Sequence, residues 1–216
     1  MCFSATASFV AGGALSAAGV ITLKSVREKR ELPLASIPLL LGIQQLTEGF
    51  VWMSLMYAHA ALNTVATHIY YVFAHIWWPV FIPLAVALIE PVPQRRRMMW
   101  VLEATGLFVG GYFVNMMATA PITSSILEDS IVYSHPGIYV YHVLALYVLV
   151  VCGSCLLSSK RLINLLGVLL AAAFAVCFFF YFAVLASVWC FFAAVLSVVI
   201  YVYFMDRGPK RTPRVR

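Results

Sequence analysis

The chain has 216 residues, of which 63% are hydrophobic and 10% are charged, and its formal net charge is +6. Soluble domains contain roughly 25% charged residues, so a water-soluble fold of this length could not bury so much apolar surface. The basic residues form short clusters between apolar runs, without the large polar domain or the interleaved aromatics of a nucleic-acid interface. The composition therefore excludes a soluble fold, argues against a nucleic-acid partner and indicates an integral membrane protein.

Seven stretches are apolar over the roughly 20 residues that a helix needs to cross a bilayer. In chain order they cover about residues 3–23, 33–58, 69–89, 98–118, 138–157, 162–182 and 185–205. We interpret the last two as separate spans with a tight hairpin near Ala183 and Val184, because one helix over both would be far longer than the bilayer is thick. The sequence therefore predicts an all-α, polytopic bundle of seven transmembrane helices in one domain, residues 1–206. The basic segment 207–216 is predicted to be a disordered cytoplasmic tail.

The basic residues indicate how the spans are oriented. All 14 Lys and Arg residues lie in the first, third and fifth connections between spans or in the tail. The other connections contain none, and the fourth carries Glu128 and Asp129 instead. Because cytoplasmic loops are enriched in Lys and Arg, we predict a multi-pass protein of the cell membrane with its amino terminus outside and its carboxyl terminus in the cytoplasm. Its expected partners are the lipid bilayer and, at the cytoplasmic face, anionic lipid.

The second predicted span contains an unusual set of polar residues. Gln44, Glu48 and Trp52 are spaced by four residues and therefore share one helical face, with Gln45 beside them. Glu48 lies near the middle of the span, where an unpaired carboxylate is costly and would protonate or bind a cation. Glu48 is either a protonated side chain that holds helices together, or a ligand, proton carrier or general base. We take it as the candidate catalytic residue.

The third predicted span contains His75 and Trp78 directly before Pro79. Proline cannot donate a hydrogen bond to the carbonyl four residues earlier, so we expect a bend that frees the carbonyl of His75. Such bends occur where a helix lines a cavity or a packed interior, so His75 is either a core histidine or part of a site. The candidate substrate-binding residues are Gln44, Gln45, Trp52, Trp78 and, near the outer end of the fourth span, Asn115.

The histidines point to a metal site as one option. All five histidines, and Cys2, map to the outer half of the spans or to the outer loops in the predicted orientation. Imidazole, thiolate and carboxylate are ligands of zinc and of redox metals. No closely spaced pair of histidines is present, so a site would have to be assembled between helices. The candidate ligands are His75, His142, Glu48 and Cys2, and the candidate cofactor is zinc or a redox metal. For His142 alone, a place in an interfacial aromatic belt is the favoured interpretation.

Two further patterns concern small residues. Ser8, Gly12 and Ser16 are spaced by four residues in the first span, which lets helix backbones approach closely and indicates a role in packing. Cys152 and Cys155 have the Cys-x-x-Cys spacing of redox enzymes. Small residues at a helix contact explain this second pattern equally well.

Residues 1–9 and 44–52 carry a resemblance to a known family. The start Met-Cys-Phe-Ser-Ala and the motif Gln-Gln-x-x-Glu-Gly-x-x-Trp resemble an uncharacterised family of small prokaryotic multi-pass membrane proteins, over about the first 90 residues. The resemblance implies the same membrane fold and no activity. It places Cys2, Gln45, Glu48 and Trp78 among the family-like positions. Seven-helix zinc hydrolases of the ceramidase and adiponectin-receptor type differ, because their closely spaced late histidine pair is missing here.

These features leave three functions open. The first is a membrane-embedded enzyme or sensor with a polar, metal-binding or small-molecule site in the outer half of the bundle. The second is a small proton- or ion-coupled transporter that uses Glu48. The third is a structural or assembly subunit of a membrane complex that binds other proteins through its small-residue faces.

Overall fold

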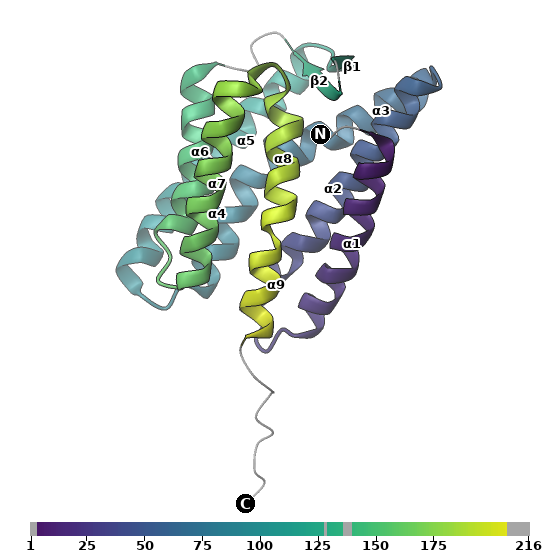
Figure 1. The fold of residues 1–216 in the computed structure, drawn as a ribbon. Helices are drawn as coiled ribbons and strands as arrows, with labels where there is room; N and C mark the ends of the chain where they lie inside the picture. Colours follow the sequence, from purple (N-terminus) through teal and green to yellow (C-terminus); the bar gives the residue numbers. More distant parts are fainter. Residues whose placement is uncertain (1–3, 128, 136–139, 207–216) are drawn as a thin grey trace, which may run out of the picture.

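The computed structural model describes residues 4–127, 129–135 and 140–206, and its helices lie side by side in one bundle (Figure 1). Their bounds are α1 Ala5–Lys24, α2 Leu32–Met56, α3 Ala60–Tyr71, α4 Trp78–Ile89, α5 Pro93–Thr119, α6 Tyr141–Leu156, α7 Arg161–Phe180, α8 Leu185–Leu196 and α9 Val198–Met205. An antiparallel hairpin of β1 Thr123–Leu127 and β2 Ser130–Ser134 stands between α5 and α6. The chain is therefore a helix bundle, as predicted, with a small hairpin that was not predicted.

Within the described residues, six helical segments are long and apolar enough to cross a membrane. One is Ala60–Ile89, in which α3 continues through the π-helical turn Val72–Trp77 into α4. Another is Phe182–Met205, which begins with the 3₁₀ turn Phe182–Val184 and contains α8 and α9. The fifth predicted span corresponds to α6, which has 16 residues and is shorter than the others. The membrane helix bundle is thus supported by several helices, and the count of seven spans stays a prediction.

The third predicted span begins earlier than the sequence indicated. The helix starts at Ala60 rather than near residue 69, and the side chain of His59 caps it by accepting a hydrogen bond from the Leu62 amide at 3.3 Å. Its first turns are polar because they contact the hairpin: Asn63 donates to the Ser124 hydroxyl at 2.8 Å. Apolar patterning could not detect turns whose polar side chains are paired with another element.

The connections lie at two ends of the bundle (Figure 1). The α1–α2, α5–α4 and α6–α7 connections and the end of α9 are at one end, and the hairpin and the start of α3 are at the other. Every Lys and Arg of the described chain belongs to the first of these ends. We call it the basic end and the opposite one the hairpin end. The predicted tail, residues 207–216, lies outside the described residues.

Glycines set the contact between α1 and α2. A Cβ atom on Gly19 would stand 2.3 Å from the backbone nitrogen of Leu39, and one on Gly42 would stand 2.7 Å from the backbone nitrogen of Ser16. The two backbones therefore touch, as small residues permit in membrane helices. The small-residue face of α1 has the packing role expected for it, although α1 stands at the edge of the bundle rather than at its centre (Figure 1).

Candidate functional site

Glu48 is the most deeply buried acidic residue of the bundle interior, with 0% of its surface exposed. The hydroxyl of Ser187 in α8 donates to its Oε1 atom at 2.5 Å, and Nε2 of Gln45 donates to its Oε2 atom at 3.4 Å. The hydroxyl of Tyr70 in α3 also interacts with this carboxyl group. Three elements thus hold Glu48 through neutral groups, and none of these partners compensates a negative charge.

The two glutamines extend this polar group across α2. Nε1 of Trp78 in α4 donates to Oε1 of Gln44 at 2.7 Å. Nε2 of Gln44 and Oε1 of Gln45 are buried without a hydrogen-bond partner; the Gln44 amide lies beside the thiol of Cys190, which is only a weak acceptor. A buried polar atom without a partner costs about 1–3 kcal/mol. We call the set Gln44, Gln45, Glu48, Tyr70, Trp78, Ser187 and Cys190 the polar cluster.

The π-helical turn before α4 explains how Pro79 is accommodated. In a π-helix each amide bonds to the carbonyl five residues earlier, and the residue five positions before Pro79 is Ala74. Proline has no N–H to donate, and the Ala74 carbonyl instead accepts the hydroxyl of Tyr147 in α6 at 2.7 Å. The carbonyl that lacks an amide donor is therefore that of Ala74, one residue before His75, because the π-helical turn is wider than an α-helical turn. The Tyr147 hydroxyl of α6 donates to it in place of an amide.

His75 points into the bundle from this turn and is 6% exposed. Its ring stacks on Tyr71 with centroids 4.4 Å apart and lies 5.1 Å from the ring of Phe113 in α5. Its buried Nδ1 atom makes no well-formed hydrogen bond to the described residues, although the imidazole interacts with the Tyr71 backbone. His75 borders a small cavity, which we call the His75 cavity, together with Ala74, Phe113, Leu144, Tyr147, Leu185, Ala186, Trp189 and Cys190.

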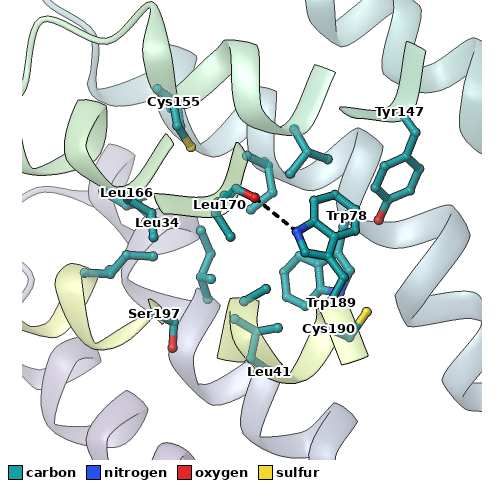
Figure 2. Close-up of a pocket in the computed structure, with 16 residues that line it drawn as sticks. Leu34, Leu41, Trp78, Tyr147, Cys155, Leu166, Leu170, Trp189, Cys190 and Ser197 are labelled. Atoms are coloured by element: carbon teal, nitrogen blue, oxygen red, sulfur yellow. Dashed lines mark hydrogen bonds between the residues drawn. The ribbon is translucent and has the colours of Figure 1, made fainter. Parts of the chain in front are cut away.

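A larger cavity, which we call the central cavity, runs from the level of Trp78 toward the basic end (Figure 2). Its wall comes from α2, α4, α6, α7, α8 and α9, with Leu34, Leu41, Leu166 and Leu170 among the aliphatic residues. Two of its lining residues, Trp78 and Cys190, also belong to the polar cluster. Three, Tyr147, Trp189 and Cys190, border the His75 cavity as well. The polar cluster and both cavities therefore adjoin one another.

Comparison with known proteins gives a family and no activity. Residues 1–215 match the sequence model of a family of unknown function, DUF6629. The chain belongs to this family. No curated protein and no solved structure matches it. The expected membership of an uncharacterised family is thereby confirmed over nearly the whole chain rather than over its first part alone.

In this DUF6629 protein the candidate metal ligands are not all placed together. Glu48 and His75 are buried, whereas His142 is exposed in the first turn of α6, and Cys2 lies outside the described residues. Within the described part of the chain, no group of three His, Cys, Asp or Glu side chains could hold a metal ion. The zinc or redox-metal site stays a prediction without support from these residues.

The candidate substrate-binding residues divide in the same way. Gln44, Gln45 and Trp78 belong to the polar cluster. Trp52 is buried in α2 and shares an apolar group with Tyr70. Asn115 is exposed on α5, apart from the cluster, because the rotation of that helix turns it outward. The pattern of apolar residues indicates how far along a span a residue lies. It does not indicate which way the side chain faces when the helix has no distinct polar face.

Several residues of the site carry no signal in the sequence of this family member. Ser187 and Cys190 stand among apolar residues late in the chain, and small polar residues are common in membrane helices. Tyr70 also could not be recognised from the sequence. Its ring stacks on Tyr133 of the hairpin, with centroids 4.4 Å apart and an interplanar angle of 5°. The hairpin therefore covers the polar cluster at its end of the bundle.

Proposed function

We propose that this protein is a membrane-embedded sensor that binds a small molecule inside its helix bundle, where the polar cluster adjoins the two cavities. The observation that carries the proposal is the pair of unpartnered amide atoms, Gln44 Nε2 and Gln45 Oε1, beside the buried Glu48. One atom is a donor and the other an acceptor, and Trp78 and Cys190, which contact Gln44, line the central cavity, so a polar ligand there would lie next to this unsatisfied pair.

Binding is favoured over catalysis by how Glu48 is held. Ser187 and Gln45 each donate to one of its oxygens, and Glu48 is not among the residues that line either cavity, so it is not placed to take a proton from a molecule in them. Ligand pockets are mostly apolar with a few convergent polar groups, and the cavities with the adjoining polar cluster have this composition.

The test is to extract and identify what the protein retains. The full chain is purified from membranes in a mild detergent, and its bound small molecules are quantified by mass spectrometry. We expect one species at near-stoichiometric amounts, reduced about tenfold in Gln45→Met, which removes the Gln45 amide. Glu48→Gln should have a similar effect, because its NH2 group cannot accept the bond from Ser187 or from Gln45 and the polar cluster loses its arrangement. A tenfold loss corresponds to about 1.4 kcal/mol, the size of one hydrogen bond.

The matched control is Glu103→Gln. Glu103 is also a buried acid in a membrane helix, but it borders neither cavity and interacts with the Leu84 backbone in α4. Equal retention in wild type, Gln45→Met and Glu48→Gln, or no retained species at all, would contradict the proposal.

A second candidate function is proton- or ion-coupled transport through Glu48. It is favoured by one observation: a fully buried carboxyl group is held by the hydroxyls of Ser187 and Tyr70, with no charged partner among the residues that the structure describes. Such groups are typical proton carriers in membrane proteins. Purified protein in liposomes with an imposed pH gradient should then carry protons, and Glu48→Gln should abolish the flux. Unchanged flux in the variant removes this candidate.

We also propose the orientation and location from which either function would operate. The basic end faces the cytoplasm of the cell membrane and contacts anionic lipid, which is supported by the gathering of Lys and Arg at that end. Fusions to the carboxyl terminus test this: a fluorescent protein should fold and fluoresce, and a periplasmic phosphatase should be inactive. The reverse pair of results would invert the orientation.

A further inference from the structure

We propose that the bound molecule is a single-chain amphiphile whose unbranched hydrocarbon chain lies in the central cavity and whose uncharged hydroxyl head lies at its border with the His75 cavity. This rests on the proposed function and names its ligand class. Tyr147, Trp189 and Cys190 border both cavities, so a molecule at that position touches both.

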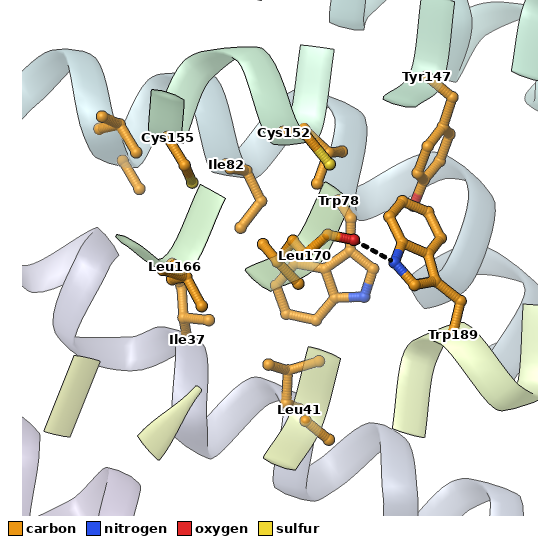
Figure 3. Packing of buried hydrophobic residues seen from close by; sticks show 14 of the residues in the cluster. Ile37, Leu41, Trp78, Ile82, Tyr147, Cys152, Cys155, Leu166, Leu170 and Trp189 are labelled. Atoms are coloured by element: carbon orange, nitrogen blue, oxygen red, sulfur yellow. Dashed lines mark hydrogen bonds between the residues drawn. The ribbon is translucent and has the colours of Figure 1, made fainter. Parts of the chain in front are cut away.

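The polar groups around the central cavity identify its occupant as hydrocarbon. Each of the strong ones already has a partner within the protein. Trp189 Nε1 donates to the Leu170 carbonyl at 3.2 Å, as Figure 3 shows, and the Ser197 hydroxyl donates to the Ala194 carbonyl at 2.6 Å. Trp78 and Tyr147 are similarly occupied by Gln44 and Ala74. A ligand in this space therefore finds aliphatic and aromatic surface and no strong free donor or acceptor, which is an environment for an alkyl chain.

The extent of the cavity suits an extended chain. Its volume, including the part that opens to the outside, is about 610 Å³. Along α6 the lining runs from Tyr147 to Cys155, which corresponds to about 12 Å at a rise of 1.5 Å per residue. A space that extends this far between aliphatic side chains can accept an unbranched chain along its length. Figure 3 shows Ile37, Leu41 and Ile82 facing this space with Leu166 and Leu170.

The head group follows from His75. Apart from an interaction with the Tyr71 backbone, its Nδ1 atom makes no well-formed hydrogen bond to the described residues, and the cavity is otherwise lined by apolar and aromatic residues together with Tyr147 and Cys190. A charged head would be buried there without a counter-charge, which is costly. A hydroxyl group both donates and accepts, so it can pair with Nδ1 in either tautomer of the imidazole. The bilayer is also the natural source of such a molecule, because amphiphiles partition into it.

The experiment uses photoaffinity labelling of the purified full chain. The probes are a long-chain primary alcohol with a diazirine in its chain, the matching alkane without the hydroxyl group, and the matching fatty acid. We expect the alcohol to label peptides of α2, α6 or α7 that line the central cavity, with competition by unlabelled long-chain alcohol. The alkane and the fatty acid should label about tenfold less, which is the ratio that one hydrogen bond or one uncompensated charge would produce.

Two pairs of variants separate cavity filling from misfolding. Leu166→Trp fills the central cavity, and Leu165→Trp places the same ring on the exposed side of α7. Val151→Phe and Leu149→Phe make the same comparison on α6. We expect labelling to fall about tenfold in the inward variants and to stay at the wild-type level in the outward ones. All four should elute as the wild-type species in size-exclusion chromatography.

His75→Phe tests the head separately, because it keeps a ring of similar shape beside Tyr71 and removes the polar atom. It should lower labelling by the alcohol to the level of the alkane. Labelling that survives both inward variants, or an alcohol that labels no better than the alkane, would overturn the inference.

If a retained species is lost in Glu48→Gln while the alcohol does not label the cavity, the proposed function stands and its ligand is of another class. If the alcohol labels the cavity equally in wild type and Glu48→Gln, the central cavity binds the hydrocarbon chain, but Glu48 does not contribute to retention of the ligand.

Discussion

Ser187 and Glu48 are 139 residues apart in the sequence, and a hydrogen bond of 2.5 Å between their side chains joins α8 to α2. This bond ties the last helical segment to the second and fixes the carboxyl group at the centre of the polar cluster. Both side chains are 0% exposed, and a hydrogen bond in a buried site of low polarity is stronger than the same bond in water.

We therefore predict that Ser187→Ala destabilises the protein by about 1–3 kcal/mol, because the Oε1 atom of Glu48 would be buried without its donor. The control is Ser197→Ala, whose hydroxyl bonds only to a carbonyl of its own segment. Thermal unfolding in detergent, followed by the loss of tertiary signal, measures both. A double variant with Glu48→Gln should be less destabilised than the sum of the single variants, since the two residues share one interaction. Strict additivity would contradict the contact.

The close approach of α5 to α4 gives a second prediction. A Cβ atom on Gly106 would stand 1.9 Å from the carbonyl oxygen of Pro79, whereas one on Gly111 would meet nothing within 4 Å. Gly106→Ala should force the two helices apart and destabilise the protein by about 1–3 kcal/mol or more. Gly111→Ala should stabilise it by up to about 1 kcal/mol through helix propensity. Unfolding midpoints measure both variants. A lower midpoint for Gly106→Ala and a higher one for Gly111→Ala would confirm the packing, and equal changes in midpoint would contradict it.

The third prediction concerns the carbonyl that Pro79 leaves without an amide donor. Tyr147→Phe keeps the ring and removes the hydroxyl that bonds to the Ala74 carbonyl at 2.7 Å. The carbonyl would then be buried and unpaired, so we expect a loss of about 1–3 kcal/mol in unfolding free energy. Tyr141→Phe on the same helix is the control, since Tyr141 is exposed. A Tyr147→Phe protein as stable as the control would show that another group satisfies Ala74.

The sequence could predict the helix bundle and the inner face of α2, because both follow from local patterns. Apolar runs mark the helices, and the spacing of Gln44 and Glu48 places them on one face. The partner Ser187 could not be found in this way, since its position beside Glu48 depends on how α8 packs against α2. The π-helical turn was also inaccessible: a proline predicts a free carbonyl, but the width of the turn decides which carbonyl it is.

The rotation of helices explains the predictions that were not supported. Asn115 lies near the end of α5 and His142 at the start of α6, both toward the hairpin end, but both are exposed. Their helices have apolar residues on every side, so no amphipathic pattern fixed the face that turns inward. Apolar runs in the sequence indicate how far along a span a residue lies. Which face of the helix turns inward is decided by contacts between helices, such as that of Gly106 with α4.

The last prediction concerns pH and the basic end, where Glu90 follows α4. Burial alone raises the pKa of this carboxyl group, but hydrogen bonds from the Ser159 amide at 2.8 Å, the Val92 amide at 3.0 Å and the Ser158 hydroxyl at 3.3 Å outweigh it and lower the pKa below its ordinary value of 4.5. The carboxylate thus joins the start of α5 to the α6–α7 connection.

A folded-state pKa below the unfolded value contributes stability that is fully present above the unfolded pKa and is lost as the pH falls through the folded pKa. Wild type should therefore be more stable than Glu90→Gln at neutral pH, and the difference should shrink as the pH falls below about 4.5. Asp206→Asn, which removes an exposed acid at the same end, is the control for the loss of one acidic group there. Unfolding midpoints of the three proteins between neutral and acidic pH measure it. A difference between wild type and Glu90→Gln that stays constant with pH would show that the ionised carboxylate is not what joins the two connections.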